Sequence, residues 1–172
     1  MSSRVVLHAG PAVGFDQPFE MLDACHERVR RSLDLLQRLQ AHVLRHGADA
    51  QARNAATDVL RYFDIAGPAH HEDEERHVLP RLRDAGLASL AERLQAEHAE
   101  MTLLWGQLRV GLAAWADGDA AELDAEVLQR YVNLYAAHLA VEEEQAFVAA
   151  RQRTAAADCA VMGQEMAARR SR

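Results

Sequence analysis

The sequence has few aromatic residues and little of the alternating pattern that β-strands require. Aromatic side chains make up only 5% of the 172 residues, although 49% of the residues are hydrophobic. Alanine, leucine, arginine and glutamate dominate instead, and these residues favour helices. Because alternating Val, Ile, Thr and Tyr are scarce, a sheet is not expected. The length suits one domain with a core and is short for two, so we expect a single all-α domain.

Cysteines and long apolar runs are also scarce. Cys25 and Cys159 lie far apart and fit neither a CxxC motif nor a zinc-ribbon spacing. Two ordinary thiols in a reducing compartment are the simpler interpretation. The apolar patch in the first fifteen residues is interrupted by Gly10, Pro11 and Gly14, unlike a secretory signal. No later run approaches membrane-spanning length. We expect a cytoplasmic protein without a membrane partner.

The charge balance is acidic. The formal net charge is −7, from 19 basic and 26 acidic side chains. A surface of that sign repels phosphate backbones, so nucleic acid is not expected as a partner. Arg169, Arg170 and Arg172 form a local exception at the C-terminus. Because chain ends are usually solvated, we expect these arginines to lie in a solvated tail.

Apolar residues at three- and four-residue steps predict two helices in the first half of the chain. The first begins with Asp16 as N-cap and Pro18 in the first turn, and it ends at His46-Gly47. The second begins after Asp49 and ends at residues 84–86. Gly67-Pro68 interrupts it, and a proline inside a helix is costly, so we expect a kink or short break there.

The same periodicity predicts two further helices and a tail. The third helix covers residues 87–115, and the turn Asp117-Gly118-Asp119 separates it from a fourth over residues 123–148. A break near Thr154 precedes a short tail helix, with Asp158 as its cap and Met162 and Met166 on one face. We expect an N-terminal extension (1–15), an up-down-up-down four-helix bundle (16–153) and a C-terminal tail (154–172).

Six ionisable residues occupy positions where the helical pattern calls for apolar ones. Each helix places one histidine there, and two of these histidines have a glutamate four residues later. A four-residue step keeps both members of such a pair on one helix face. The six residues therefore converge on the bundle axis: His26, His70, Glu74, His98, His138 and Glu142.

Such a cluster indicates a metal site. Unpaired ionisable groups in a core are costly and are normally paired or metal-bound. Imidazole with carboxylate suits iron, zinc or manganese, whereas calcium prefers oxygen ligands throughout. Two glutamates can bridge two metals and leave two histidines for each, with an open position for a small molecule. A single inward histidine is more often a hydrogen-bonded core residue, so a metal-free helical protein stays an alternative.

The sequence around these residues resembles the hemerythrin-like (HHE cation-binding) family. Residues 70–80 read HHEDEERHVLP, similar to the family stretch HHxxEExxLFP. His138 with Glu142 looks like the second HxxxE of the family, while Cys25-His26 and Glu97-His98 match its other histidines. The resemblance covers residues 16 to 150. It implies a pair of iron ions, oxo- or hydroxo-bridged, although zinc or manganese stays possible.

Departures from the oxygen carriers of that family point to a different branch. Oxygen-carrying hemerythrins supply two histidines one turn apart on the third helix, whereas Leu94 and Thr102 flank His98 here. Their last carboxylate lies five residues after its histidine, but Glu142 follows His138 by four. The chain is similar to the four-histidine, two-glutamate branch. That resemblance implies O2 or NO binding in redox or nitrosative stress, or in iron handling.

Neighbouring polar and aromatic residues have separate interpretations. His71 should point away from the centre and support it or reach the surface, and His77 forms a ferritin-type pair with Glu74 but no second inward pair exists. Core packing is favoured over a redox role for Tyr131 and Tyr135. Two further groups are distinguished: Met101 and Trp105 as walls of a pocket, and His8, His42 and His46 as solvated histidines.

Two other functions stay open at the level of the sequence. An oxidase- or peroxidase-like di-iron enzyme is compatible with open metal positions, although no substrate pocket can be recognised in the sequence. A sensor or interaction module is the other, in which metal occupancy alters the fold and a protein partner responds to the change. The sequence therefore leaves open whether the protein is an enzyme.

Overall fold

The computed structural model describes residues 13–171. The predictions for residues 1–12, including the interrupted apolar patch and His8, and for Arg172 lie outside this range. Within it the chain forms helices and no strand, which confirms the all-α prediction. No helix in the described part is long and apolar enough to cross a membrane.

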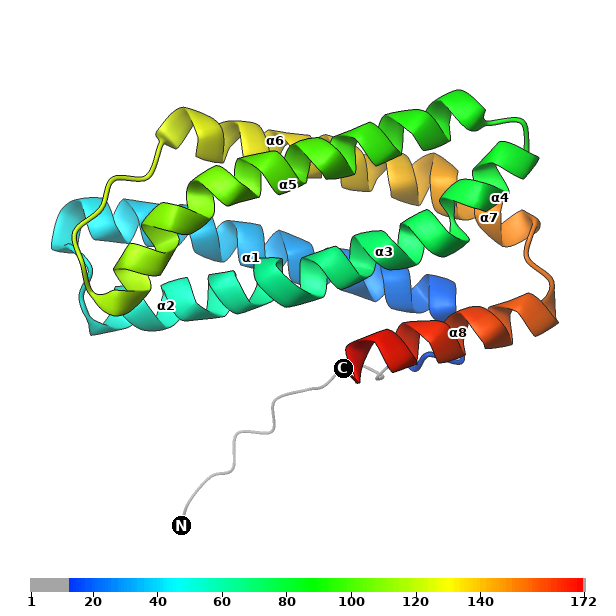
Figure 1. Cartoon of the computed structure of the whole chain (residues 1–172), viewed down its shortest axis with the longest axis horizontal. Helices are drawn as coiled ribbons and strands as arrows, with labels where there is room; N and C mark the ends of the chain where they lie inside the picture. The colour runs from blue at the N-terminus through cyan, green and yellow to red at the C-terminus, as the bar shows by residue number, and fades with distance from the viewer. Residues whose placement is uncertain (1–12, 172) are drawn as a thin grey trace, which may run out of the picture.

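Four helical rods form the bundle, and a fifth helix lies against its side (Figure 1). The first rod is a single helix, the second and fourth each contain a π-helical turn (η), and the third is again a single helix. Short connections join neighbouring rods, which therefore run antiparallel. The elements are α1 (Pro18–His46), α2 (Ala50–Arg61), η1 (Tyr62–Ala66), α3 (Gly67–His77), α4 (Leu79–Asp84), α5 (Ala88–Asp117), α6 (Ala125–Val141), η2 (Glu142–Ala146), α7 (Phe147–Gln152) and α8 (Ala156–Arg170).

The helix starts follow local capping chemistry in part. Asp49 caps α2 as predicted, because its carboxylate accepts from the backbone N–H of Ala52 at 2.8 Å. The prediction of Asp16 as the cap of α1 is wrong: Gln17 takes that position, directly before the first-turn proline, and its side chain makes no capping bond. The prediction of Asp158 as the cap of the tail helix is also wrong, because Ala155 takes that position. Asp158 lies inside the first turn of α8, where its charge still favours the helix terminus.

The predicted kink at Gly67-Pro68 is replaced by a continuous helix with a π-helical turn. The N–H of Gly67 bonds to the carbonyl of Tyr62, five residues earlier, so one extra residue fits into the turn before Pro68. A proline lacks an N–H and crowds the preceding turn, and a π-turn is one way in which a helix absorbs it. The second rod therefore reaches α3 without a break, and η2 provides an unpredicted counterpart in the fourth rod.

The apolar interior has two parts, one on either side of the polar centre. The larger part, called here the far core, includes Leu36, Ala56, Leu112 and Trp115 and fills the end of the bundle where α2 begins. The smaller part, called the near core, surrounds α4, α7 and α8 and includes Met162 and Met166, both fully buried as predicted. The helical periodicity also predicted inward positions for Leu87, Gln145 and Val148, but all three residues are exposed.

The C-terminal tail is docked, so the prediction of a solvated arginine cluster is wrong for its two described members. α8 packs along α1 and α3 at the near end of the bundle (Figure 1). The side chains of Arg169 and Arg170 both form ion pairs with Asp73, which is completely buried. The sequence near the C-terminus does not indicate this ion pair, because Asp73 lies almost a hundred residues before the arginines in the chain.

Candidate metal centre

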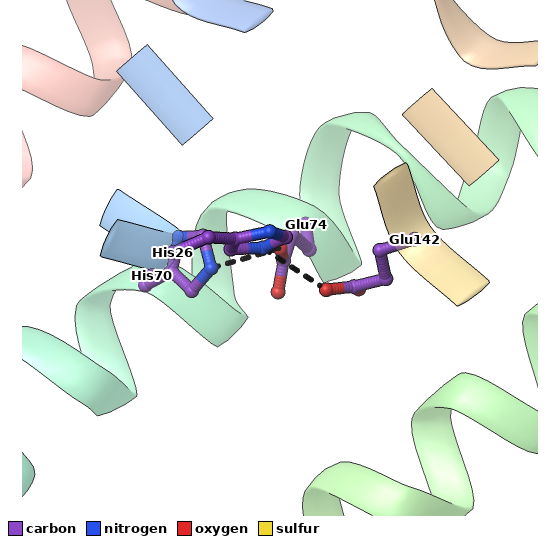
Figure 2. A group of neighbouring side chains, drawn as sticks. All are labelled: His26, His70, Glu74 and Glu142. Atoms are coloured by element: carbon purple, nitrogen blue, oxygen red, sulfur yellow. Dashed lines mark ion pairs between the residues drawn. The ribbon is translucent and has the colours of Figure 1, made fainter. Parts of the chain in front are cut away.

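The structure brings all six predicted site residues together in the bundle interior. His26 comes from α1, His98 from α5 and His138 from α6, while α3 supplies both His70 and Glu74, and Glu142 is the first residue of η2. All six side chains are buried. Figure 2 shows His26, His70, Glu74 and Glu142 converging from three rods.

The six residues form two four-residue groups that share both glutamates. One group contains His26 and His70, and the other contains His98 and His138. In each group the atoms that could bind a metal lie within 4.8 Å of one another. Two adjacent sites that share Glu74 and Glu142 are the arrangement expected when two carboxylates bridge two ions.

The two oxygens of each glutamate point to different groups. Oε1 of Glu74 lies 3.0 Å from Nε2 of His70 and 3.6 Å from Nε2 of His26, whereas its Oε2 lies 3.4 Å from Nε2 of His98. Glu142 repeats the pattern, with Oε2 at 3.2 Å from His26 and Oε1 at 3.2 Å from His138. Each carboxylate thus spans the two histidine pairs.

Many of these inward atoms lack a hydrogen-bond partner among the described residues. They include both oxygens of Glu74, both oxygens of Glu142, and Nε2 of His26 and of His70. Buried polar atoms without partners are rare in proteins and call for an explanation. Two metal ions bound to imidazole nitrogens and carboxylate oxygens would satisfy them, so the residues present fit such a group.

Outside the centre, three of the four histidines bond to carboxylates that the sequence analysis did not identify. Nδ1 of His26 lies 2.8 Å from Glu143, Nδ1 of His98 lies 3.0 Å from Glu75, and Nδ1 of His138 lies 2.7 Å from Glu97. Such partners orient the ring so that Nε2 faces the centre.

A signal for these partners was present in the sequence. Each carboxylate directly adjoins one of the six site residues: Glu75 follows Glu74, Glu97 precedes His98, and Glu143 follows Glu142. Adjacency does not indicate which histidine is bonded, however, because all three carboxylates bond to histidines of other helices.

Without metal the centre is a charged cluster of imidazolium and carboxylate groups. Burial lowers the pKa of His26, but the facing carboxylates of Glu142 and Glu74 outweigh it and raise the value to about 9. Against the effect of burial, the charge of Glu74 raises the pKa of His70, and the charge of Glu142 raises the pKa of His138. Burial raises the pKa of Glu74, but the neighbouring histidines hold it well below its usual value. His26, His70 and His138 therefore favour the protonated form, which competes with metal binding.

His71 lies beside the centre in a supporting position, as predicted, and not among the six. Its ring stacks on that of His98 with centroids 4.1 Å apart, and its Nε2 lies 3.4 Å from the hydroxyl of Tyr135. Burial and the neighbouring His98 hold the pKa of His71 well below its usual value, so the ring is neutral at pH 7.

A cleft of about 400 Å³ reaches the centre on the side of His98. Met101 and Trp105 line it, as expected for walls of a pocket, and His71 and Tyr135 line it as well. Of the six site residues, His98 alone lines the cleft, which therefore ends beside the group that contains His98 and His138.

Other singled-out residues lie at or beyond the edge of the centre. Tyr131 packs in the far core, where its ring centroid lies 5.0 Å from that of Tyr135. His77 faces α8, where its Nε2 lies 3.1 Å from Glu165, and does not join Glu74. His42 pairs with Asp49 at 3.0 Å, and His46 is exposed. Neither cysteine forms a disulfide.

Comparison with known proteins agrees with this geometry. The family described as Hemerythrin HHE cation binding domain matches residues 17–150, a span that contains all six site residues. An uncharacterized protein of Haemophilus influenzae is 30% identical over 158 residues, which cover 91% of each chain. The similarity therefore extends over nearly the whole length of both proteins, and the name of the relative states no function. The match over most of the chain shows that this protein belongs to the hemerythrin HHE cation-binding domain family.

Proposed function

We propose that the protein binds two iron ions with His26, His70, Glu74, His98, His138 and Glu142, as a member of the four-histidine, two-glutamate branch, and that the loaded centre binds O2 or NO. The observation that carries the proposal is the pair of buried four-residue groups that share Glu74 and Glu142. Each ion would receive two imidazole nitrogens and one oxygen from each glutamate. Four protein ligands leave room for a bridging oxygen and an open position at an ion that favours higher coordination.

Iron is preferred over zinc because of the donor set and the family resemblance. Structural zinc sites are closed four-coordinate sites, usually rich in cysteine, and neither thiol of this chain belongs to the two groups. When bound at these residues, a pair of ferrous ions would supply the electrons for binding a diatomic molecule. The four rods would hold the ions between them, and Glu75, Glu97 and Glu143 orient the histidine rings. Small molecules would enter through the cleft at His98.

The test is the metal content per chain, measured by elemental analysis after anaerobic loading with ferrous iron, with an optical spectrum before and after exposure to air or NO. We expect about two irons per chain and an absorption change that depends on the gas. His70→Ala and Glu142→Ala should each lower the metal content without unfolding the metal-free chain. His42→Ala is the matched control, because His42 pairs with Asp49 outside the centre.

The outcomes separate this proposal from its alternatives. Zinc alone with a featureless spectrum, or unchanged stoichiometry in both ligand variants, would contradict the di-iron assignment. Turnover of peroxide with a reductant would favour the oxidase- or peroxidase-like enzyme. A large change of helicity on chelation would favour the sensor, because metal occupancy would then control the fold.

A further inference from the structure

The C-terminal helix α8 is attached to the metal-binding rod by buried charge. Asp73 in α3 is completely buried and forms ion pairs with two arginines of α8. Nε of Arg169 donates to its Oδ1 at 2.7 Å, and a terminal nitrogen of Arg170 lies 2.6 Å from its Oδ2. Arg169 also donates to Glu72 at 3.2 Å, and only 11% of its side chain is exposed. This cluster differs from the exposed ion pairs elsewhere on the surface, which contribute little to stability.

A second anchor lies one helical turn further along α3. Nε2 of His77 lies 3.1 Å from Glu165 of α8, and His77 follows Asp73 by four residues. On α8, Met166 lies between Glu165 and Arg169, and Met162 lies one turn before it; both are fully buried. A methyl group on Gly163 would collide with the carbonyl of Phe15, which shows how closely α8 approaches the chain before α1. α8 is therefore a packed part of the structure, although it lies beyond residues 17–150 that the family model matches.

The anchored face of α3 adjoins the face that carries the metal-binding residues. Successive residues of a helix are separated by about 100°, so Asp73 points toward α8 while Glu74 points into the bundle. Glu74 faces histidines of both groups, through Oε1 to His70 and through Oε2 to His98. A rotation or fraying of this turn of α3 would move Glu74 together with Asp73.

Loss of Arg169 and Arg170 would favour such a movement energetically. A buried carboxylate that has lost its partner is strongly destabilising, because its charge is then neither paired nor solvated. Asp73 could recover solvation only if α3 rotated or α8 withdrew. Glu74 is the next residue in the chain. A movement that exposed Asp73 to water would therefore displace Glu74 from its position between the two histidine pairs.

We propose that α8 is a positioning element of the metal centre: Arg169 and Arg170 compensate Asp73 and thereby hold Glu74 where it can bridge the two ions. This inference rests on the proposed function and adds a role for a helix outside the part of the chain that the family model matches. Undocking of α8 would release metal, although no residue of α8 belongs to the two metal-binding groups.

The test measures how fast a chelator removes iron from the loaded full-length protein. In the double variant Arg169→Gln/Arg170→Gln, we expect removal to become about tenfold faster, the lower end of the effect reported for loss of groups that support metal ligands. Arg151→Gln is the matched control, because Arg151 joins Glu20 in an exposed ion pair between α7 and α1. A far-core variant, Leu112→Ala, controls for a general loss of stability.

Rescue by charge removal distinguishes positioning from packing. Asp73→Asn removes the carboxylate that requires compensation, so adding it to the double arginine variant should restore slow metal release. Fast release in Leu112→Ala, or failure of Asp73→Asn to rescue the double variant, would overturn the proposal. If Glu74→Ala itself left the metal content unchanged, the proposed metal centre would fail, whereas a normal response of Glu74→Ala with no effect of the arginines would refute only the role of α8.

Discussion

The far core and the region of the bundle that holds the six site residues, called here the metal end, are built from the same four rods but differ in what fills them. In the far core, Leu36, Ala56 and Leu112 are fully buried and Trp115 is nearly so. At the metal end, six equally buried side chains are ionisable, and many of their inward atoms lack partners among the described residues. Apolar contacts fill the far core, whereas the polar atoms of the metal end need bound protons or metal ions as partners.

This difference separates stability from function within one fold. Burial of apolar surface stabilises the folded chain by about 25 cal/mol per Å² without any ligand. Burial of charges is costly unless they are paired, so the metal end depends on what its nitrogens and oxygens bind. We therefore expect the two ends to respond differently to metal, pH and mutation, with the effects ordered below from the largest to the smallest.

Metal removal should produce the largest change and should act on one end only. At a free metal concentration about 1,000 times the dissociation constant, binding adds about 4 kcal/mol to the free energy of unfolding. Chelation should remove this amount and increase amide hydrogen exchange near His26, Glu74 and Glu142, while exchange near Leu112 in the far core stays slow. Equal acceleration at both ends would contradict the separation.

Leu112→Ala should destabilise the protein by about 3–4 kcal/mol, because it leaves a cavity in a fully buried position. The site lies about 20 Å from His98 along α5. Denaturant unfolding should show the loss both with and without metal, while the metal content per chain stays at the wild-type value. A fall in metal content would show that the two ends are coupled.

The metal-free protein should lose stability as the pH rises. His26 has a folded-state pKa of about 9, above its ordinary value of 6.5, so its contribution is fully present below pH 6.5 and is lost as the pH rises through 9. The loss should reach up to about 3 kcal/mol. His26→Gln should reduce the dependence, because His70 and His138 still contribute. The loaded protein should not show it, because metal replaces the proton. A metal-free chain that is equally stable at pH 6 and pH 9 would refute the charged cluster.

Loss of one outer carboxylate should weaken metal binding without affecting the far core. Glu97 bonds to Nδ1 of His138 at 2.7 Å. Glu97→Ala should weaken metal binding about 10- to 100-fold, which corresponds to about 2 kcal/mol. Competition with a chromophoric chelator measures the change, and Glu100→Ala is the control because Glu100 pairs with Arg130 away from the centre. Equal affinities of the two variants would show that the outer bond does not matter.

The smallest effect should come from a helix cap. Asp124 accepts hydrogen bonds from Glu126 N and Val127 N at the start of α6. Asp124→Ala should lower the free energy of unfolding by about 1 kcal/mol, in equal measure with and without metal. Thermal unfolding of both forms would show a difference if the cap were coupled to the metal end.

Most of the rods followed from the sequence because their determinants are local. Pro18, the turn at Gly118 and the Asp49 cap fix helix ends within a few residues, and the structure places them as expected. The π-turns did not follow, because an extra residue in a turn depends on how the rod fits its neighbours. Pro68 indicated an irregularity, but only the packed rod decided that η1 would absorb it.

The six inward residues could also be predicted, whereas their surroundings could not. Helical spacing places His70 and Glu74 on one face whatever the partner helices do. The partners of Asp73 and His26 come from α8 and η2, and no spacing within one helix indicates them. The acidic run that contains Asp73 looks like a solvated face, yet two of its four residues are completely buried.

The sequence by itself determined the helical class, the order of the rods and one inward histidine in each rod. Those properties depend on the periodicity of each segment, which is a local quantity. The tertiary structure alone decided that Glu74 and Glu142 each face both histidine pairs, that three carboxylates orient the rings, and that Arg169 and Arg170 compensate Asp73. Periodicity fixes the face on which a side chain lies, but the packing of the rods decides which charge it meets there.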